Sequence, residues 1–275
     1  MRIAMSRYSI LLGAMGLMTA LVLLVATPGC EPTVQQDAAP PTVTVAVTEG
    51  GITWDYVALG DSMVAGHSYA DYYAVHIEAD LGVKVTLHNW GIGGQSSAQL
   101  LEMLRNNQKL RNAISEAEVV TFVIGANDIF PGLRRYKYGV DCGGADNQDC
   151  IREALTSFRA NYDAIIAEIL SLQSTTDTII RTMDYYFPAV NETKRFGIYE
   201  DIKPHWQALN EHIVQAASEH NIPVARVYVA LNGPNGDEDP ASKGYIKVDG
   251  AHLNDAGHRL VAELHRELGY EPLGP

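Results

Sequence analysis

Residues 119–128, VVTFVIGAND, hold the clearest strand signal in the chain and the polar turn that directly follows it. Residues 119–124 are β-branched or aromatic throughout, with no alternation between apolar and polar side chains. A strand of this kind is typical of a parallel sheet that helices cover on both faces. The stretch therefore predicts an α/β fold, and Gly125 marks the end of the strand.

Four further apolar runs have the length and composition of strands, and amphipathic stretches with helical spacing separate them. The expected strands are residues 56–59, 83–87, 119–124, 178–183 and 224–229. The expected helices are residues 71–81, 96–115 in one or two pieces, 151–169 and 202–213, and a last helix that Asn254 caps. This order predicts a three-layer α/β sandwich around a central, five-stranded, mostly parallel sheet.

Polar and glycine-rich segments lie where the carboxyl ends of these strands are expected. Residues 60–63, 89–96 and 125–128 follow the first three strands, and residues 249–252 precede the last helix. Because parallel strands end at the same edge of a sheet, these segments should meet there. Each one alone is weak evidence, since a serine can cap a helix, glycines can supply positive φ and Asn-Asp is an ordinary turn. Their combination predicts a catalytic site.

The four segments resemble, block by block, those of the SGNH (GDSL-type) hydrolases. Gly60-Asp61-Ser62-Met63 is similar to the GDSL block, with methionine in place of leucine. Residues 89–94 are similar to the block whose glycine amide lies in the oxyanion hole. Residues 125–128 match the Gly-x-Asn-Asp block, and residues 249–252 match the final Asp-x-x-His block. The resemblance covers about residues 54–269 and implies the flavodoxin-like SGNH hydrolase fold.

The resemblance implies a catalytic triad of Ser62, His252 and Asp249, with no metal or other cofactor. A serine hydroxyl is a poor nucleophile unless a base contacts it. The imidazole of His252 suits this role because imidazole titrates near neutral pH. Asp249 lies three residues earlier, where its carboxylate can fix the tautomer of the ring and stabilise the imidazolium.

The tetrahedral intermediate of such a reaction places negative charge on the former carbonyl oxygen. The backbone N–H groups of Ser62 and Gly94 and the side-chain amide of Asn127 are expected to bind it. The expected reaction is hydrolysis of a carboxylic ester through an acyl-enzyme, with acyl groups from acetyl to lipid-length left open. Two other functions fit the same residues: an inactive binding module that keeps the fold, and acyl transfer to an acceptor other than water.

Other histidines could act as the base, but their sequence positions disfavour them. No carboxylate has an evident orienting position for His67, His88 ends an expected strand, and His258 is expected on the surface of the last helix. Ser62 also lacks the Gly-x-Ser-x-Gly pattern of an α/β-hydrolase elbow, because Val64 occupies the last position.

The composition and net charge of the chain indicate which classes of binding partner are expected. The 275 residues are 47% hydrophobic, enough for one sizeable core, and carry a formal net charge of −13. An acidic surface repels phosphate backbones, so nucleic acid is not an expected partner. No histidine pair has the spacing of a zinc site, so no metal is expected. The expected partner is a small-molecule, lipid or carbohydrate ester, and without a coiled-coil stretch the expected state is a monomer.

Residues 1–29 have the pattern of an export signal. Arg2 and Arg7 precede an uncharged, apolar run at residues 8–26, and small residues follow. Removal of residues 1–29 takes away two positive charges and no negative ones, which leaves a net charge of −15. The same run of 19 residues is long enough to span a bilayer, so an uncleaved membrane anchor stays open.

Gly29-Cys30 resembles the bacterial lipoprotein cleavage box, although Thr27 stands where that box usually has leucine. Cys30 is therefore a candidate for lipidation, which would attach the protein to a membrane. Residues 30–50 are expected to form a flexible tether, and residues 51–275 the hydrolase domain of an exported protein.

The other two cysteines, Cys142 and Cys150, flank a short polar loop. They predict a disulfide, which fits an oxidising, extracytoplasmic compartment. The surrounding segment, residues 129–150, is expected to form a wall or lid over the site.

Two groups of side chains near the expected site have open roles. Arg134 and Arg135 either contact an anionic group of the substrate or belong to a solvated basic loop. Tyr185, Tyr186 and Phe187 end the fourth strand at the same edge, where they either line a pocket or pack in the core.

Overall fold

The computed structural model describes residues 51–274, which form a parallel five-stranded sheet with the order β2-β1-β3-β4-β5. The predicted export signal, the tether and Cys30 lie outside the described residues. Among those that are described, no helix combines the length and the apolar character needed to cross a membrane. The strands are β1 (Thr53–Gly60), β2 (Lys84–Gly91), β3 (Val119–Val123), β4 (Ile179–Met183) and β5 (Val224–Ala225).

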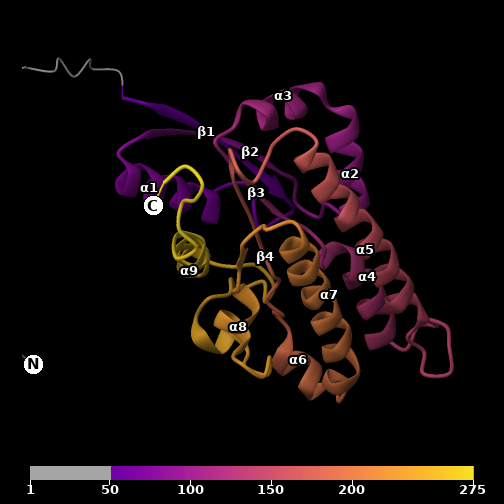
Figure 1. The fold of residues 1–275 in the computed structure, drawn as a ribbon. Helices are drawn as coiled ribbons and strands as arrows, with labels where there is room; N and C mark the ends of the chain where they lie inside the picture. The colour runs from indigo at the N-terminus through magenta and orange to yellow at the C-terminus, as the bar shows by residue number, and fades with distance from the viewer. Residues whose placement is uncertain (1–50, 275) are drawn as a thin grey trace, which may run out of the picture. The chain divides into compact units, whose positions relative to one another are not determined.

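Helices cover both faces of this sheet. Figure 1 shows α1 and α9 together on one side of the strands, and α2, α4, α5 and α7 on the other. The helices are α1 (Tyr69–Leu81), α2 (Ser97–Asn106), α3 (Gln108–Glu116), α4 (Ala126–Lys137), α5 (Asp149–Leu170), α6 (Val190–Arg195), α7 (Tyr199–Glu219), α8 (Val227–Asn232), the 3₁₀ helix η1 (Pro240–Lys243) and α9 (Asp255–Arg266). The predicted three-layer α/β sandwich is confirmed.

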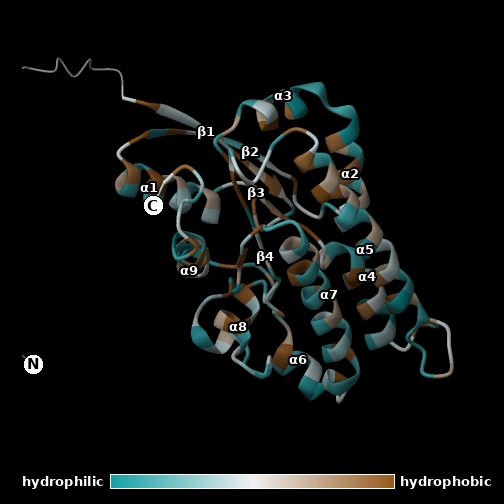
Figure 2. Cartoon of the chain, in the orientation of Figure 1, coloured by the Kyte–Doolittle hydropathy of each residue, from teal (hydrophilic) through white to brown (hydrophobic). Residues whose placement is uncertain are grey.

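The strands at the centre of the sheet are buried on both faces. Every residue of β3 and β4 is buried, as are the last five residues of β1. The edge strand β2 instead mixes exposed and half-buried residues. Figure 2 shows the long helices α5 and α7 as alternating apolar and polar segments, as expected for helices with one face on the sheet. The continuous apolar run that predicted the fold thus lies in the middle of the core.

Local side-chain caps begin several helices where the sequence places them. Ser68 and Asp71 form a reciprocal capping box at α1, and Ser96 and Gln99 form another at α2. The side chain of Asn254 accepts a hydrogen bond from the N–H of Gly257 at 3.1 Å, so the predicted cap of α9 is confirmed. The predicted helix at residues 96–115 consists of two pieces, α2 and α3.

One sequence prediction was wrong in part. The fifth strand contains only Val224 and Ala225, because residues 227–232 form helix α8. The predicted wall or lid at residues 129–150 begins within helix α4, which occupies residues 126–137 in spite of Pro131 within it. In both places an apolar or proline-containing run adopts a helix that local propensity does not favour, and packing against the core decides the outcome.

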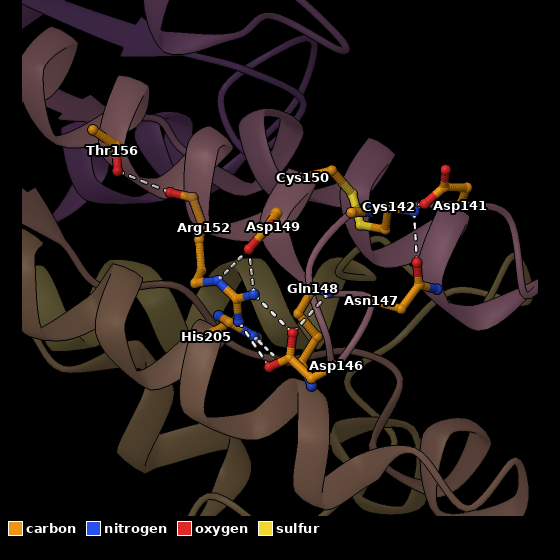
Figure 3. Close-up of polar contacts among 11 residues, drawn as sticks. Asp141, Cys142, Asp146, Asn147, Gln148, Asp149, Cys150, Arg152, Thr156 and His205 are labelled. Carbon is orange, nitrogen blue, oxygen red and sulfur yellow. Dashed lines mark hydrogen bonds and ion pairs between the residues drawn. A yellow bond between two sulfur atoms is a disulfide. The ribbon is translucent and has the colours of Figure 1, made fainter.

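A disulfide joins Cys142 to Cys150, across a sequence separation of eight residues. Figure 3 shows this bond beside the polar loop that leads into α5. Within the loop, the Asn147 side chain accepts a hydrogen bond from the N–H of Cys142 at 2.7 Å, and Arg152 pairs with both carboxylate oxygens of Asp146. The disulfide and these contacts fix the chain between α4 and α5.

Candidate active site

The strand order reverses between β1 and β3, which flank each other although β2 comes between them in the sequence. Gly60 at the end of β1 lies opposite Val123 at the end of β3, so the segments that follow leave the sheet side by side. Such a switch point is the usual binding position in open α/β sheets. Ser62 follows β1, and Asn127 lies in the first turn of α4 after β3.

A cavity of about 280 Å³ lies at this position. It collects residues that are more than 180 positions apart in the sequence. Its wall consists of Asp61, Ser62, Met63, Ala126, Asn127, Phe130, Arg134, Tyr185, Tyr186, Pro188, Trp206, Ala251 and His252. The structure therefore brings Ser62, Asn127 and His252 together in one cavity.

Two hydrogen bonds join Asp249 to His252, and a third joins Asp249 to Ala251. The His252 ring nitrogen Nδ1 lies 2.9 Å from Asp249 Oδ2, and Asp249 Oδ1 accepts from the backbone N–H groups of Ala251 and His252. The backbone hydrogen bonds, together with the contact to the ring, lower the pKa of Asp249 to about 2. The carboxylate is thus ionised at neutral pH and leaves Nε2 of the ring free to face a nucleophile.

Tyr186 fixes the loop that carries the histidine. Its hydroxyl donates to the carbonyl of Ala251 at 2.6 Å, and its ring is buried. The backbone N–H of Lys247 also donates to the carbonyl of His252. The side chain of His252 itself stays 48% exposed.

Ser62 lies in a turn that the backbone carbonyl of Asp61 organises by accepting from the N–H groups of Val64 and Ala65. Within residues 51–274 no hydrogen bond joins the Ser62 hydroxyl to the His252 ring. In ligand-free enzymes such contacts often tighten only when substrate binds. Ser62 and His252 both lie in the wall of the cavity.

The two expected backbone oxyanion donors have no partner among the described residues. Neither the N–H of Ser62 nor that of Gly94 makes a hydrogen bond there. Gly94 lines a second depression of about 690 Å³ between the 92–95 loop and helices α2 and α3, and it is not part of the wall of the 280 Å³ cavity. The structure thus leaves both N–H groups available but does not place them in one wall.

Two glycines, Gly91 at the end of β2 and Gly94 in the loop after it, have different structural roles. Gly94 has a φ of +78°, which favours glycine, whereas a Cβ there would meet open space. At Gly91 a Cβ would lie 2.4 Å from the backbone nitrogen of Ala65. Gly91 therefore lets β2 approach the turn that carries Ser62, and the Asn89 amide ties the same turn by donating to the carbonyls of Val64 and Gly66.

The side-chain amide of Asn127 already has partners for both of its N–H groups. One donates to Asp61 Oδ2 at 3.1 Å, and the other to the carbonyl of Gln95 at 3.0 Å. These bonds link the segments after β1, β2 and β3. An oxyanion at this position would have to share or replace one of them.

Asp61 is a buried carboxylate at the centre of this network. It is 1% exposed, and it accepts from the N–H of Met63 and the hydroxyl of Tyr185 as well as from Asn127. Burial raises the pKa of Asp61 to about 6, although these hydrogen bonds favour the charged form. Asp61 thus joins the turn that carries Ser62 to the segments that follow β3 and β4.

Asp128, the next residue of the same motif, has a separate role. Its carboxylate accepts from the backbone N–H and the hydroxyl of Ser97 at the start of α2, at 2.9 and 2.5 Å. Asn161 of α5 donates to the same hydroxyl at 3.0 Å. Asp128 therefore fixes the start of α4 against α2 and α5.

Comparison with known proteins agrees with this geometry. The sequence model of the GDSL-like lipase/acylhydrolase family matches residues 58–260, from within β1 to within α9. The chain belongs to this family. The match includes all four segments that carry the candidate site.

Individual relatives are distant. The protein YpmR of Bacillus subtilis (strain 168), which is itself uncharacterized, is 24% identical over 213 residues, covering 75% of this chain and 77% of YpmR. The lipase Lip_vut3 from a goat rumen metagenome has a similar structure, with a TM-score of 0.66 and 23% identity over 80% of this chain and 99% of that one. The acetylxylan esterase Axe2 of Geobacillus stearothermophilus has a TM-score of 0.56 and 20% identity over 82% and 98%. These structures establish the GDSL/SGNH hydrolase fold.

The other histidines take positions that differ from their expected ones. His67 does have a carboxylate nearby, Asp71 at 3.3 Å, but it does not line the cavity. His88 lies within β2 and pairs with Asp55 at 2.8 Å. The prediction that His258 is exposed was wrong, because it is only 6% exposed and burial lowers its pKa to about 4. None of the three competes with His252 for the cavity.

Sequence reasoning missed several residues of this site. Asp61 was part of a recognised motif, yet nothing in the sequence shows that its side chain is buried or that Tyr185 contacts it. Tyr185 and Tyr186 turn out both to line the cavity and to be buried, so their two alternatives were not exclusive. Trp206 of α7, whose ring N–H donates to the carbonyl of Tyr185 at 3.0 Å, had only the helical spacing of a core residue.

A metal centre finds no support in the part of the chain that the structure describes. Over residues 51–274, no group of three or more histidine, cysteine, aspartate or glutamate side chains could hold an ion.

The raised pKa of Asp61 predicts a specific pH dependence of stability. In the unfolded chain its pKa returns to about 3.9, so the folded state favours the protonated form. The contribution of Asp61 is then complete below about pH 4 and is lost as pH rises through about 6. The free energy of unfolding of the wild type relative to Asp61→Asn should fall by about 2 kcal/mol between pH 4 and 7.

Urea denaturation of both proteins across this pH range measures the difference. Asp177→Asn, which changes an exposed carboxylate on the loop before β4, is the matched control and should show no such trend. A difference between wild type and Asp61→Asn that stays constant with pH would contradict the raised pKa.

Proposed function

We propose that this protein hydrolyses carboxylic esters through a covalent acyl-enzyme. The observation that carries the proposal is the shared cavity of Ser62 and His252, with Asp249 hydrogen-bonded to the far side of the imidazole. In the proposed reaction the Ser62 hydroxyl attacks the ester carbonyl and His252 accepts its proton. His252 then gives the proton to the leaving alcohol, and water repeats the sequence to release the acid.

The negative charge of the tetrahedral intermediate needs donors close to Ser62. The N–H groups of Ser62 and Gly94 are proposed to bind it, because each lacks a partner among the described residues. The amide of Asn127 is proposed as the third donor, with Asp61 holding it beside the nucleophile. A single donor of this kind contributes about 3–4 kcal/mol to stabilising the transition state.

The size of the cavity favours a short acyl group. About 280 Å³ is at the lower end for a ligand pocket, and buried aromatic side chains, Tyr185, Tyr186 and Trp206, form much of its wall. The structural relatives include acetylxylan esterases, whose acyl group is acetyl. A short-chain ester is therefore the proposed substrate class.

Ser62→Ala should remove ester turnover, because it removes the nucleophile. We expect kcat/KM for 4-nitrophenyl acetate to fall by about 10⁴-fold or more. A fluorophosphonate probe should add its mass to the peptide that contains Ser62 in the wild type and not in the variant.

Ser171→Ala, at an exposed position after α5, is the matched control and should behave as the wild type in both assays. If the folded wild-type protein neither reacts with the probe nor turns over any ester, it is a binding module. If added alcohols receive the acyl group in preference to water, the protein is an acyltransferase.

Acyl length provides a separate prediction. With 4-nitrophenyl esters, kcat/KM should be highest from acetate to butyrate and about tenfold lower for octanoate, since longer chains do not fit between the aromatic walls. Initial rates over a series of even-numbered acyl chains measure this. A kcat/KM that rises up to octanoate and beyond would contradict a short-acyl pocket.

We also propose that the protein is exported and attached to a membrane through a lipid on Cys30. The export pattern of residues 1–29 and the disulfide between Cys142 and Cys150 support an oxidising destination. Mass spectrometry of the protein from its native membrane fraction should find Cys30 as the first residue, with a lipid attached. An unmodified Cys30, or a chain that keeps residues 1–29, would contradict this proposal.

A further inference from the structure

The last turns of α4 carry three cationic side chains, Arg134, Arg135 and Lys137, in an otherwise acidic protein. Cations at a helix C-terminus interact favourably with the helix dipole, which accounts for their presence in general terms. Their surroundings differ, however. Arg135 donates to the backbone carbonyl of Asp141, and Lys137 Nζ lies 2.6 Å from Glu192 Oε1.

Arg134 is the one of the three that faces the candidate active site. It lines the cavity that contains Ser62 and His252, and it also lines an adjoining groove that shares Phe130. Within residues 51–274 its guanidinium makes no hydrogen bond and no ion pair, although it is exposed on a protein with a formal net charge of −13. Glu192, the carboxylate of that groove, is already paired with Lys137.

Helix geometry explains how Arg134 reaches the cavity. Asn127, Phe130 and Arg134 are separated by three and four residues, so they lie on one face of α4. All three line the cavity. At about 1.5 Å per residue, Arg134 lies roughly 10 Å along the helix from Asn127, the proposed oxyanion donor. Helix α4 thus sets the distance between the backbone of Arg134 and that of Asn127.

The charges around the cavity leave this cation without a counter-ion. Among residues 51–274, Asp61 is the only carboxylate in the wall, and it is buried and already accepts three hydrogen bonds. Over the same residues, Arg134 is the only lysine or arginine in that wall. A guanidinium presents five N–H donors in a planar fork that matches a carboxylate, phosphate or sulfate.

We propose that Arg134 binds an anionic group carried by the ester substrate, at a distance from the scissile bond that α4 sets. This inference rests on the proposed esterase function and adds a substrate class to it, namely esters with a carboxylate, phosphate or sulfate on the acyl or the alcohol part. Because the protein as a whole repels anions, such a substrate needs a local cation to enter the cavity.

Matched ester pairs test the inference. On the acyl side, the 4-nitrophenyl monoester of glutaric acid carries a carboxylate, and 4-nitrophenyl valerate is its neutral counterpart of equal length. On the alcohol side, 4-acetoxybenzoate is charged and 4-acetoxybenzamide is neutral. The quantity measured is the ratio of kcat/KM for the charged ester to that for the neutral one, at low ionic strength.

Arg134→Gln should lower this ratio by about five- to tenfold in at least one pair, as expected for the loss of a partly exposed, charge-assisted contact. Arg134→Lys keeps the charge and should lower it less. Arg135→Ala is the matched control. Arg135 is the next residue of the same helix, but its side chain donates to the carbonyl of Asp141, so this variant should leave the ratio as in the wild type. The pair that responds shows which part of the substrate carries the anion.

Added salt gives an independent readout. Raising the ionic strength to about 0.5 M should lower the wild-type ratio toward that of Arg134→Gln, because salt screens exposed charges. If neutral esters are hydrolysed but Arg134→Gln and wild type show the same ratio in both pairs, the inference is overturned and the esterase proposal stands. If no ester of either pair is hydrolysed, both are overturned.

Discussion

The pairing of β1 with β3 is the constraint on which the rest of the site depends. Strand β2 lies on one side of β1 and strand β3 on the other, so the chain passes over β1 between them. Gly60 at the end of β1 then lies opposite Val123 at the end of β3. The segments after the two strands emerge next to each other, with the serine on one and the asparagine on the other. A shift of this register by one residue would turn alternate side chains to the opposite face and separate the two groups.

Buried polar bonds hold these segments together where no regular structure does. Asp61 binds the turn after β1 to Asn127 and Tyr185, and Asp128 binds α4 to α2. Burial disfavours the charged form of a carboxylate, and this is why the pKa of Asp61 is raised. The protein tolerates this burial because hydrogen bonds to a charged group hold side chains in one arrangement, as a site with preorganised donors requires.

The two ends of α4 carry side chains of opposite charge, Asp128 in the first turn and Arg134 in the last turns. Its first turn supplies Asn127 and Asp128 to the polar network of the site, while its last turns supply Arg134 to the cavity wall. The disulfide and the loop before α5 fix the chain just beyond that end. One helix thereby couples the proposed oxyanion donor to the proposed anion contact, so a displacement of α4 would change both.

The sequence by itself determined the layer architecture and indicated the candidate members of the site. The uninterrupted apolar run at residues 119–124 indicated a sheet covered on both faces, because strand burial follows from local patterns. The polar segments after the strands, through their resemblance to the motifs of the family, pointed to Ser62, Asn127, Asp249 and His252. Only the tertiary structure decided the rest. Four features depend on which distant groups pack against each residue, and no local pattern carries that information. They are the helices at residues 126–137 and 227–232, the burial of His258, the contact of Asp61 with Tyr185, and the pairing of Arg135 but not Arg134.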